Sequence, residues 1–182
     1  RGGEYALSTE LCDGGAFYDF EVTKLSILTR DIGLAGIEVY DILRDRYGIQ
    51  IEFGDIGNIL AYVSIGDREL YLDRLIGALN DIKRIYSKDK TGMLDHEYIN
   101  PIVKLSPQDA FYGNKKSVPI EQSSGKISGE FVMCYPPGIP ILAPGEQITD
   151  EILAYIKYAG DKGCFLTGTQ DLEIKNIMIL DE

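Results

Sequence analysis

The sequence is short of the residues that most often build metal centres and disulfides. It has a single histidine, His96, and three cysteines, Cys12, Cys134 and Cys164, none in a Cys-x-x-Cys pair. Zinc sites and disulfide frameworks use closely spaced cysteines and histidines, so we predict neither. An odd number of widely separated cysteines is typical of a reducing cytoplasm, where we expect the protein to work.

Long apolar runs and an excess of basic residues are also missing. No stretch approaches the roughly 20 apolar residues that a transmembrane helix needs. The chain has 18 Lys and Arg against 29 Asp and Glu, a formal net charge of −11. Nucleic acids and anionic membranes are bound by clustered basic side chains, so we expect no nucleic-acid partner and no membrane partner.

Two short motifs have residues suited to chemistry, but neither is complete. His96 stands between Asp95 and Glu97, a possible metal or acid–base cluster, although a solvated loop is the usual outcome for so polar a stretch. The residues Ser-Ser-Gly-Lys at 123–126 resemble the end of a phosphate-binding P-loop. They lack its first glycine, because Ile120 occupies that position, and the hydroxyl residue after the lysine. The residues by themselves therefore show no self-contained catalytic set.

The pattern over the first 90 residues alternates between strands and helices. Apolar and β-branched residues predict strands over 23–29, 49–53 and 58–65. Helical spacing predicts a helix over 37–47 and a longer one over 67–86. The inward stripe predicted for the longer helix comprises Leu72, Leu75, Ile76, Leu79, Ile82 and Tyr86.

A polar segment over 87–101 predicts a linker, with a boundary near residue 95. After it, Ser106 and Pro107 are typical of the first residues of a helix, and Thr149 followed by two acidic residues predicts another helix start. Strands are predicted over 126–135 and 173–180. We therefore expect a soluble α+β protein of two parts, residues 1–95 and 96–182.

The segment 135–146, YPPGIPILAPGE, contains four of the seven prolines. Proline fixes φ near −65°, and the residue before it is held extended, so the segment is predicted to be an extended, nearly preformed loop. Gly138 and Gly145 permit turns or close backbone approaches within it. Two interpretations stay open: a stiff connector between subdomains, or a rigid wall of a ligand site or subunit interface.

One carboxylate stands out just ahead of this segment. Glu130 lies in an apolar stretch beside Gly129. A strand carboxylate most often faces water. If Glu130 faces a cleft instead, burial would demand a cationic partner, which a ligand could supply.

Residues 125–149, GKISGEFVMCYPPGIPILAPGEQIT, resemble the C-terminal region of the Orn/Lys/Arg decarboxylase family. These are bacterial pyridoxal-phosphate enzymes of the aspartate-aminotransferase fold. Residues 106–128 and 18–67 resemble further segments of the same family, so the resemblance extends from about Tyr18 onward. It implies that residues 1–95 form the small domain of the aminotransferase-like fold and that 96–182 form the family's C-terminal α+β domain.

The resemblance implies decarboxylation of arginine, lysine or ornithine, with arginine slightly preferred, to give a polyamine precursor and CO2. Members of the family carry pyridoxal phosphate on a lysine that follows a histidine in a large domain. Here His96 is followed by Glu97, and the chain has no His-Lys pair. We therefore expect the large cofactor-binding domain to precede Arg1, no catalytic residue and no covalently bound cofactor in this chain, and no activity from the chain alone.

The same resemblance suggests where substrate would be bound. Glu130 is the candidate for the distal cation of a basic amino acid, with Tyr135, Pro136 and Gly138 as the adjoining wall. Family members work as dimers or larger assemblies, so a homodimer or larger homo-oligomer is expected. The alternative is a free-standing, non-catalytic module for binding or dimerisation derived from the same domain.

Overall fold

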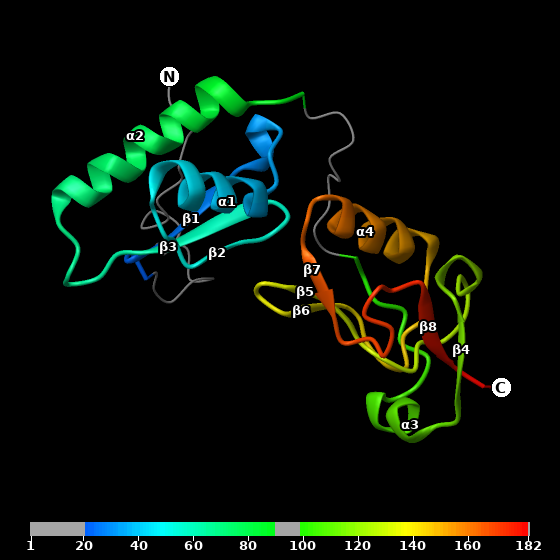
Figure 1. Ribbon diagram of the computed structural model, residues 1–182. Helices are drawn as coiled ribbons and strands as arrows, with labels where there is room; N and C mark the ends of the chain where they lie inside the picture. The colour runs from blue at the N-terminus through cyan, green and yellow to red at the C-terminus, as the bar shows by residue number, and fades with distance from the viewer. Residues whose placement is uncertain (1–20, 90–98, 182) are drawn as a thin grey trace, which may run out of the picture.

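Two groups of helices and strands make up the computed structural model, which describes residues 21–89 and 99–181 (Figure 1). The mixture of helix and sheet confirms the predicted α+β class. The predicted boundary between residues 95 and 96 lies outside the described residues. So do Cys12 and the His96 cluster.

Residues 21–89 form a three-stranded antiparallel sheet in the order β1–β3–β2. The strands are β1 (Lys24–Leu28), β2 (Phe53–Gly54) and β3 (Asn58–Tyr62). Ile27 pairs with Ile59 in the centre of the sheet. Burial alternates along β1 and β3, so one face of this sheet is covered and the other is open to solvent.

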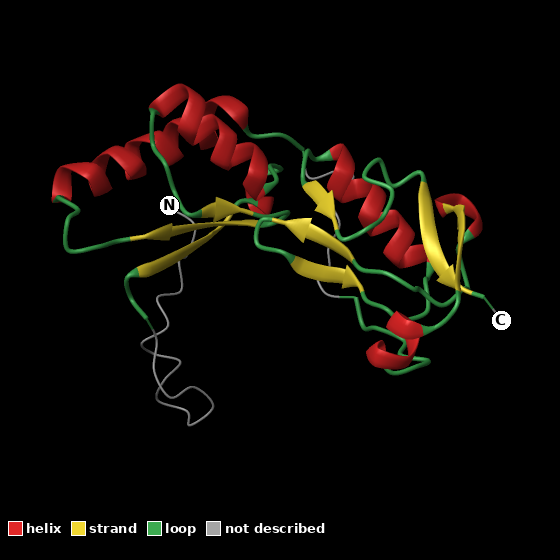
Figure 2. Ribbon diagram, turned by 60° about the horizontal axis from the view of Figure 1, so that its bottom comes forward, coloured by secondary structure: helices red, strands yellow, loops and turns green. Residues whose placement is uncertain are grey.

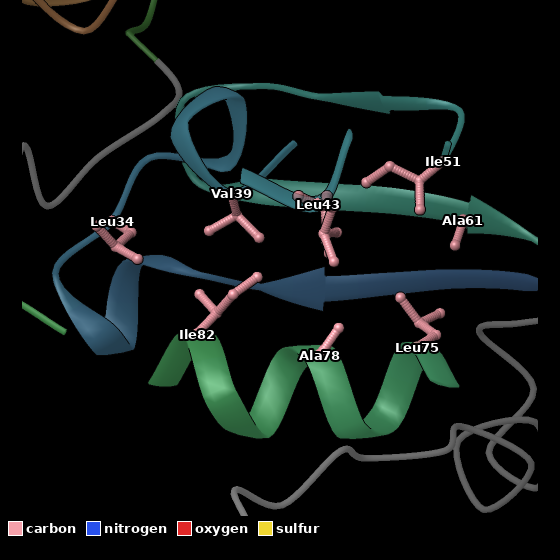
Figure 3. Close-up of a cluster of buried hydrophobic side chains, with 9 residues drawn as sticks. Leu34, Val39, Leu43, Ile51, Ala61, Leu75, Ala78 and Ile82 are labelled. Atoms are coloured by element: carbon pink, nitrogen blue, oxygen red, sulfur yellow. The ribbon is translucent and has the colours of Figure 1, made fainter. Parts of the chain in front are cut away.

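Two helices cover that face, α1 (Gly36–Tyr47) and α2 (Glu69–Tyr86), as Figure 2 shows. A short 3-10 turn, Arg30–Ile32, leads from β1 towards α1. The side chains of α1 and α2 that point towards the sheet pack against its side chains and form the core drawn in Figure 3. The buried members of this core are Leu34, Val39, Leu43, Ile51, Ile59, Ala61, Leu75, Ala78 and Ile82.

One predicted member of the α2 stripe is wrong: Ile76 is 57% exposed. Leu75, Leu79, Ile82 and Tyr86 are buried in the core or packed against it, and Leu72 is half-buried. A helix turns by about 100° per residue, so Ile76 points away from the sheet when Leu75 points towards it.

The predicted strands 49–53 and 58–65 are longer than the observed strands β2 and β3. The predicted inward positions Ile49, Ile51 and Phe53 are nevertheless each less exposed than Gln50 and Glu52.

Residues 99–181 form two small antiparallel sheets, β6–β5–β7 and β4–β8. Helix α4 packs against the first of them through a core of aliphatic side chains such as Ile152 and Ile156. The predicted strand 126–135 is regular only at its end, and the predicted strand 173–180 begins later. The element bounds are α3 (Pro107–Tyr112), β4 (Lys115–Pro119), a 3-10 turn (Ile120–Gln122), β5 (Val132–Tyr135), β6 (Ile139–Leu142), α4 (Asp150–Asp161), β7 (Phe165–Thr167) and β8 (Asn176–Leu180).

Both predicted helix starts in this group are confirmed. The Ser106 hydroxyl accepts a hydrogen bond from the Asp109 amide at 3.1 Å, with Pro107 in the first helical position. The Thr149 hydroxyl accepts one from the Ile152 amide at 3.2 Å. These caps satisfy amides that the helix itself leaves unpaired, which is why the local sequence alone locates them.

A third, smaller buried cluster joins the two groups. Ile56 from the first group packs with Cys134, Ala159 and Cys164 from the second. An ion pair lies beside it: the Lys162 ammonium is 3.8 Å from the Glu38 carboxylate of α1. The arrangement of the two groups thus brings the β2–β3 turn next to α4 and the β5–β6 strands.

No helix within residues 21–89 and 99–181 has the length and apolar character to cross a lipid bilayer.

Replacing either of two glycines of the first group by alanine is expected to change the stability of the chain, in opposite directions. Gly77, inside α2, has no atom within 4 Å of where a Cβ would stand. Gly77→Ala should raise the free energy of unfolding by about 0.5–1 kcal/mol, because alanine restricts the unfolded chain and favours helix. At Gly36 a Cβ would lie 1.7 Å from the Asn58 carbonyl oxygen, so Gly36→Ala should destabilise the chain. Urea unfolding of both variants measures this, and a less stable Gly77→Ala protein would contradict it.

Candidate functional site

The proline-rich segment is a β-hairpin rather than the extended loop predicted for it. Strands β5 and β6 pair antiparallel around a tight turn, in which the Tyr135–Pro136 and Pro136–Pro137 peptide bonds are cis. Gly138 has φ of 93°, and its amide donates to the Cys134 carbonyl at 2.9 Å. The left-handed glycine lets the chain reverse where the proline pattern alone predicted continued extension. Its role as a turn glycine is confirmed.

The second half of the segment is a junction between distant pieces of chain. Gly145, with φ of 89°, donates its amide to the Ser128 carbonyl at 2.9 Å. Its carbonyl accepts from the amides of Lys104 and Leu105 at 2.8 and 3.1 Å. The neighbouring Pro144 is fully buried. Gly145 therefore ties residues 104–105, at the start of the second group, to the segment that contains Ser128.

A cavity of about 220 Å³ lies against the hairpin, where both groups of elements contribute walls. From the first group come Asp55 and Ile56 of the β2–β3 turn. Helix α4 adds Tyr155. The remaining lining residues are Ile99, Pro101, Cys134, Pro136, Pro137, Ile139, Pro140, Ile141 and Glu146.

Among residues 21–89 and 99–181, two acidic residues, and no lysine or arginine, line this cavity. One oxygen of Asp55 accepts from the amides of Gly57 and Asn58 at 2.8 and 2.6 Å. One oxygen of Glu146 accepts from the Ala143 amide at 2.8 Å. These hydrogen bonds hold the two carboxylates in place. The cavity therefore combines apolar walls with two fixed acidic side chains. That combination suits an aliphatic chain that ends in a cation.

A second, more polar cavity of about 380 Å³ lies within the first group. It is bounded by the segment after α1, the end of β3 and the start of α2. Its walls come from one group alone, and none of the predicted site residues lines it. The cavity at the hairpin is therefore the better candidate site.

Glu130 is buried, with 8% of its surface exposed, and its carboxylate faces backbone amides. One oxygen accepts from the Gln170 amide at 2.8 Å, and the other accepts from the Met178 amide of β8 at 2.7 Å. The carboxylate thus continues the hydrogen bonding of β8 where the paired segment 127–129 turns away. Beside it, the aliphatic stem of Lys115 covers Gly129. Binding of a substrate cation by Glu130 stays a prediction, but the described contacts give this side chain a structural role.

Of the other three predicted site residues, Tyr135 ends β5 and Pro136 and Gly138 lie in the hairpin turn, and one of the three lines the cavity. Pro136 lines it, together with the neighbouring Pro137. Tyr135 is 55% exposed and pairs across the sheet with Phe165. A Cβ at Gly138 would lie 3.5 Å from the Tyr135 ring, so the glycine lies close to that ring. Asp55, Glu146 and Tyr155 were missed, because they reach this cavity only through folding.

The pKa of Glu38, on α1, is lowered by its contacts with other elements. Burial alone raises the pKa, but the hydrogen bond from the Lys88 ammonium at 2.7 Å and that from the Ala35 amide at 2.8 Å outweigh it. Lys162, at the end of α4, adds a further positive charge. The carboxylate therefore stays ionised and keeps the contact between the two groups charged.

Within the described ranges, 21–89 and 99–181, no three His, Cys, Asp or Glu side chains are grouped so that they could hold a metal ion.

Comparison with known proteins finds decarboxylases of basic amino acids. Residues 90–168 match a family model described as Orn/Lys/Arg decarboxylase, C-terminal domain. An arginine decarboxylase from Bacillus subtilis (strain 168) is 37% identical over 183 residues, which cover 99% of this chain and 37% of that protein. A lysine decarboxylase from Hafnia alvei is 26% identical over 170 residues, covering 68% of this chain and 23% of the relative. The chain thus spans little more than a third of the length of the first of these relatives.

Solved structures show the same fold. The lysine decarboxylase of Francisella novicida superposes with a TM-score of 0.62 at 21% identity, covering 90% of this chain and 31% of that one. The constitutive lysine decarboxylase of Escherichia coli superposes with a TM-score of 0.58 at 19% identity, covering 89% of this chain and 32% of that one. At these identities the likeness establishes the arrangement of elements, in agreement with the α+β class.

Proposed function

Because this chain belongs to the Orn/Lys/Arg decarboxylase family through that family's C-terminal domain, we propose that it is the C-terminal part of an enzyme that removes the α-carboxylate of a basic amino acid. The observation that carries the proposal is the 37% identity to an arginine decarboxylase across 99% of the chain. We favour arginine as the substrate, since the lysine decarboxylase of Hafnia alvei is only 26% identical to this chain, against 37% for the arginine decarboxylase.

The cofactor proposed for the whole enzyme is pyridoxal phosphate, which supplies an electron sink for decarboxylation when bound. The cavity at the hairpin does not fit this group. Among the residues that the structure describes, its lining has no lysine to attach an aldehyde and no cation to balance a phosphate. We therefore assign the cofactor to the portion of the relatives that this chain does not match, and assign no step through it to the residues described here.

The role proposed for this chain is to form a wall of the substrate pocket. Asp55 and Glu146 give the cavity negative charge, and Tyr155 and the hairpin prolines give it an apolar surface. A basic amino acid, whose aliphatic chain ends in a guanidinium or ammonium group, could contact the apolar surface with its chain and the carboxylates with its cation. Asp55 and Glu146 would hold the cation in place, while the apolar walls exclude water.

A subunit or domain contact is proposed at the exposed edge of the same hairpin. Tyr135, Ile139 and Phe165 are 55%, 66% and 63% exposed, although all three are large and apolar. Tyr135 pairs with Phe165 across β5 and β7, and Ile139 pairs with Cys134 across β5 and β6, so the three lie on one small sheet. The exposed Tyr135–Phe165 pair is suited to contact with the larger part of the enzyme or with a second subunit, while Ile139 belongs to the opposite face of the sheet.

A chimeric enzyme tests the proposal. These 182 residues replace the matching segment of the Bacillus subtilis arginine decarboxylase, and release of CO2 from arginine, lysine and ornithine is measured. We expect arginine-dependent activity within about tenfold of the parent, because a related C-terminal segment restores the same pocket wall. The 182-residue chain alone, and the parent lacking its segment, should both be inactive.

Two results would overturn the proposal. One is a chimera that folds and binds pyridoxal phosphate but decarboxylates none of the three amino acids. The other is CO2 release by the 182 residues alone. If the chimera is inactive while the isolated chain forms a stable dimer in sedimentation, the non-catalytic dimerisation module becomes the better interpretation.

A further inference from the structure

Two cysteines that are 30 positions apart in the sequence, Cys134 and Cys164, are brought together by the fold. Cys134 belongs to β5 and pairs with Leu166 of β7, while Cys164 immediately precedes β7. Both belong to one buried cluster with Ala159 of α4. Both thiols are free, and the pairing of β5 with β7 places them on neighbouring chain segments. The fold therefore holds two free thiols in one buried cluster.

The two thiols differ in acidity. The interaction between the two thiols raises the pKa of Cys134, to which burial adds, while the same interaction lowers the pKa of Cys164. The nearby Asp55 carboxylate raises both. Cys164 is consequently the better nucleophile of the pair, and Cys134 keeps its proton.

A small oxidant has a route to this buried pair. Only 7% of Cys134 and 8% of Cys164 are exposed at the surface, which excludes large reagents. Cys134 nevertheless lines the cavity of about 220 Å³ at the hairpin. A molecule the size of hydrogen peroxide fits such a space, whereas a protein oxidoreductase or a bulky disulfide does not.

We propose that Cys134 and Cys164 are a site of reversible oxidation by hydrogen peroxide or a similarly small hydroperoxide. The Cys164 thiolate attacks one peroxide oxygen and the O–O bond breaks. The leaving hydroxide takes up the proton that Cys164 lost on ionising, giving a sulfenic acid and the first water. The Cys134 sulfur then attacks the Cys164 sulfur, its proton leaves with the departing hydroxyl as water, and a disulfide forms. In total, two thiols are oxidised, one peroxide is reduced, and two waters are released.

The disulfide would act on the cavity itself. It would join β5 of the hairpin covalently to the short segment between α4 and β7, beside the point where β5 and β7 already pair. Because Cys134 and Tyr155 both line the cavity, the bond would limit how far these two walls can separate. The inference depends on the thiol geometry alone and not on the proposed decarboxylase activity.

The test uses the purified 182-residue chain carrying Cys12→Ser, so that only the pair can react. The reduced protein is treated with increasing hydrogen peroxide, unfolded in the presence of an alkylating reagent, digested and analysed by mass spectrometry. We expect both thiols to be lost together, a linked peptide containing Cys134 and Cys164 that is about 2 Da lighter than the sum of its reduced parts, and full recovery with dithiothreitol. The rate should exceed that of the same chain unfolded in urea.

Single variants separate the two roles. In Cys134→Ser, peroxide should leave a sulfenic acid on Cys164 that dimedone traps, since no second thiol resolves it. In Cys164→Ser, Cys134 should react at least tenfold more slowly, because its proton is retained. If a variant fails to fold, peptide mapping of the Cys12→Ser chain still shows whether Cys134 and Cys164 form a disulfide. Both thiols remaining alkylatable after peroxide treatment, or overoxidation without a linked peptide, would overturn the proposal.

Discussion

Replacing Glu130 by glutamine is expected to lower the free energy of unfolding by about 3 kcal/mol, because one of the two buried backbone amides that it binds loses its acceptor. Each carboxylate oxygen now accepts one amide, from Gln170 and from Met178. A glutamine offers one oxygen, and its NH2 group would face the second amide donor. Urea unfolding of the 182-residue chain, followed by circular dichroism, measures the change.

Glu121→Gln is the matched control, because Glu121 belongs to the same group of elements but is exposed. Its stability should stay within about 0.5 kcal/mol of the parent. Stability of the Glu130→Gln chain equal to that of the control would refute the structural role. The chimeric enzyme then separates the two explanations for Glu130: a raised Michaelis constant with unchanged stability would favour binding of the substrate cation, as the sequence predicted.

Gly145→Ala is expected to cost about 3–5 kcal/mol, for two reasons that add. The glycine has φ of 89°, a conformation that disfavours any side chain. A Cβ there would also lie only 2.4 Å from the Leu105 carbonyl oxygen. This oxygen belongs to backbone that is itself tied to Gly145 by hydrogen bonds, so it cannot move aside without breaking them.

Gly125→Ala isolates the first of these two costs. Gly125 has φ of 78°, but no atom lies within 4 Å of its missing Cβ. Its substitution should therefore cost about 1 kcal/mol, from backbone strain alone. Equal losses for the two variants, measured as shifts in the urea midpoint, would show that the contact with Leu105 contributes nothing and would contradict the junction assigned to Gly145.

Local chemistry explains the predictions that the structure confirms. Ser106 and Thr149 cap helices through their own hydroxyls, and Gly48 ends α1 in the left-handed conformation at φ of 58°. The inward face of α2 follows from its 3.6-residue repeat, except at Ile76. Resemblance over long segments identified the family. Each of these depends on residues within a few positions of one another or on a motif that can be compared directly.

The site, by contrast, was only partly predictable. The prolines indicated a stiff segment, but its reversal into a hairpin depends on Gly138 and on the pairing of β5 with β6. Glu130 was recognised as an unusual carboxylate, whereas its amide partners are 40 and 48 residues away. Nothing in the spacing of the cysteines indicated that Cys134 and Cys164 would meet.

From its sequence alone, then, this protein's class, its helix ends, its turn glycines and its family could be determined, because each depends on short-range hydrogen bonding, residue periodicity or a recognisable motif. Tertiary structure alone decided which carboxylates face the cavity, what Glu130 binds and which thiols touch. Those outcomes depend on how separate elements pack, and packing brings together residues such as Asp55 and Tyr155 that share no local pattern.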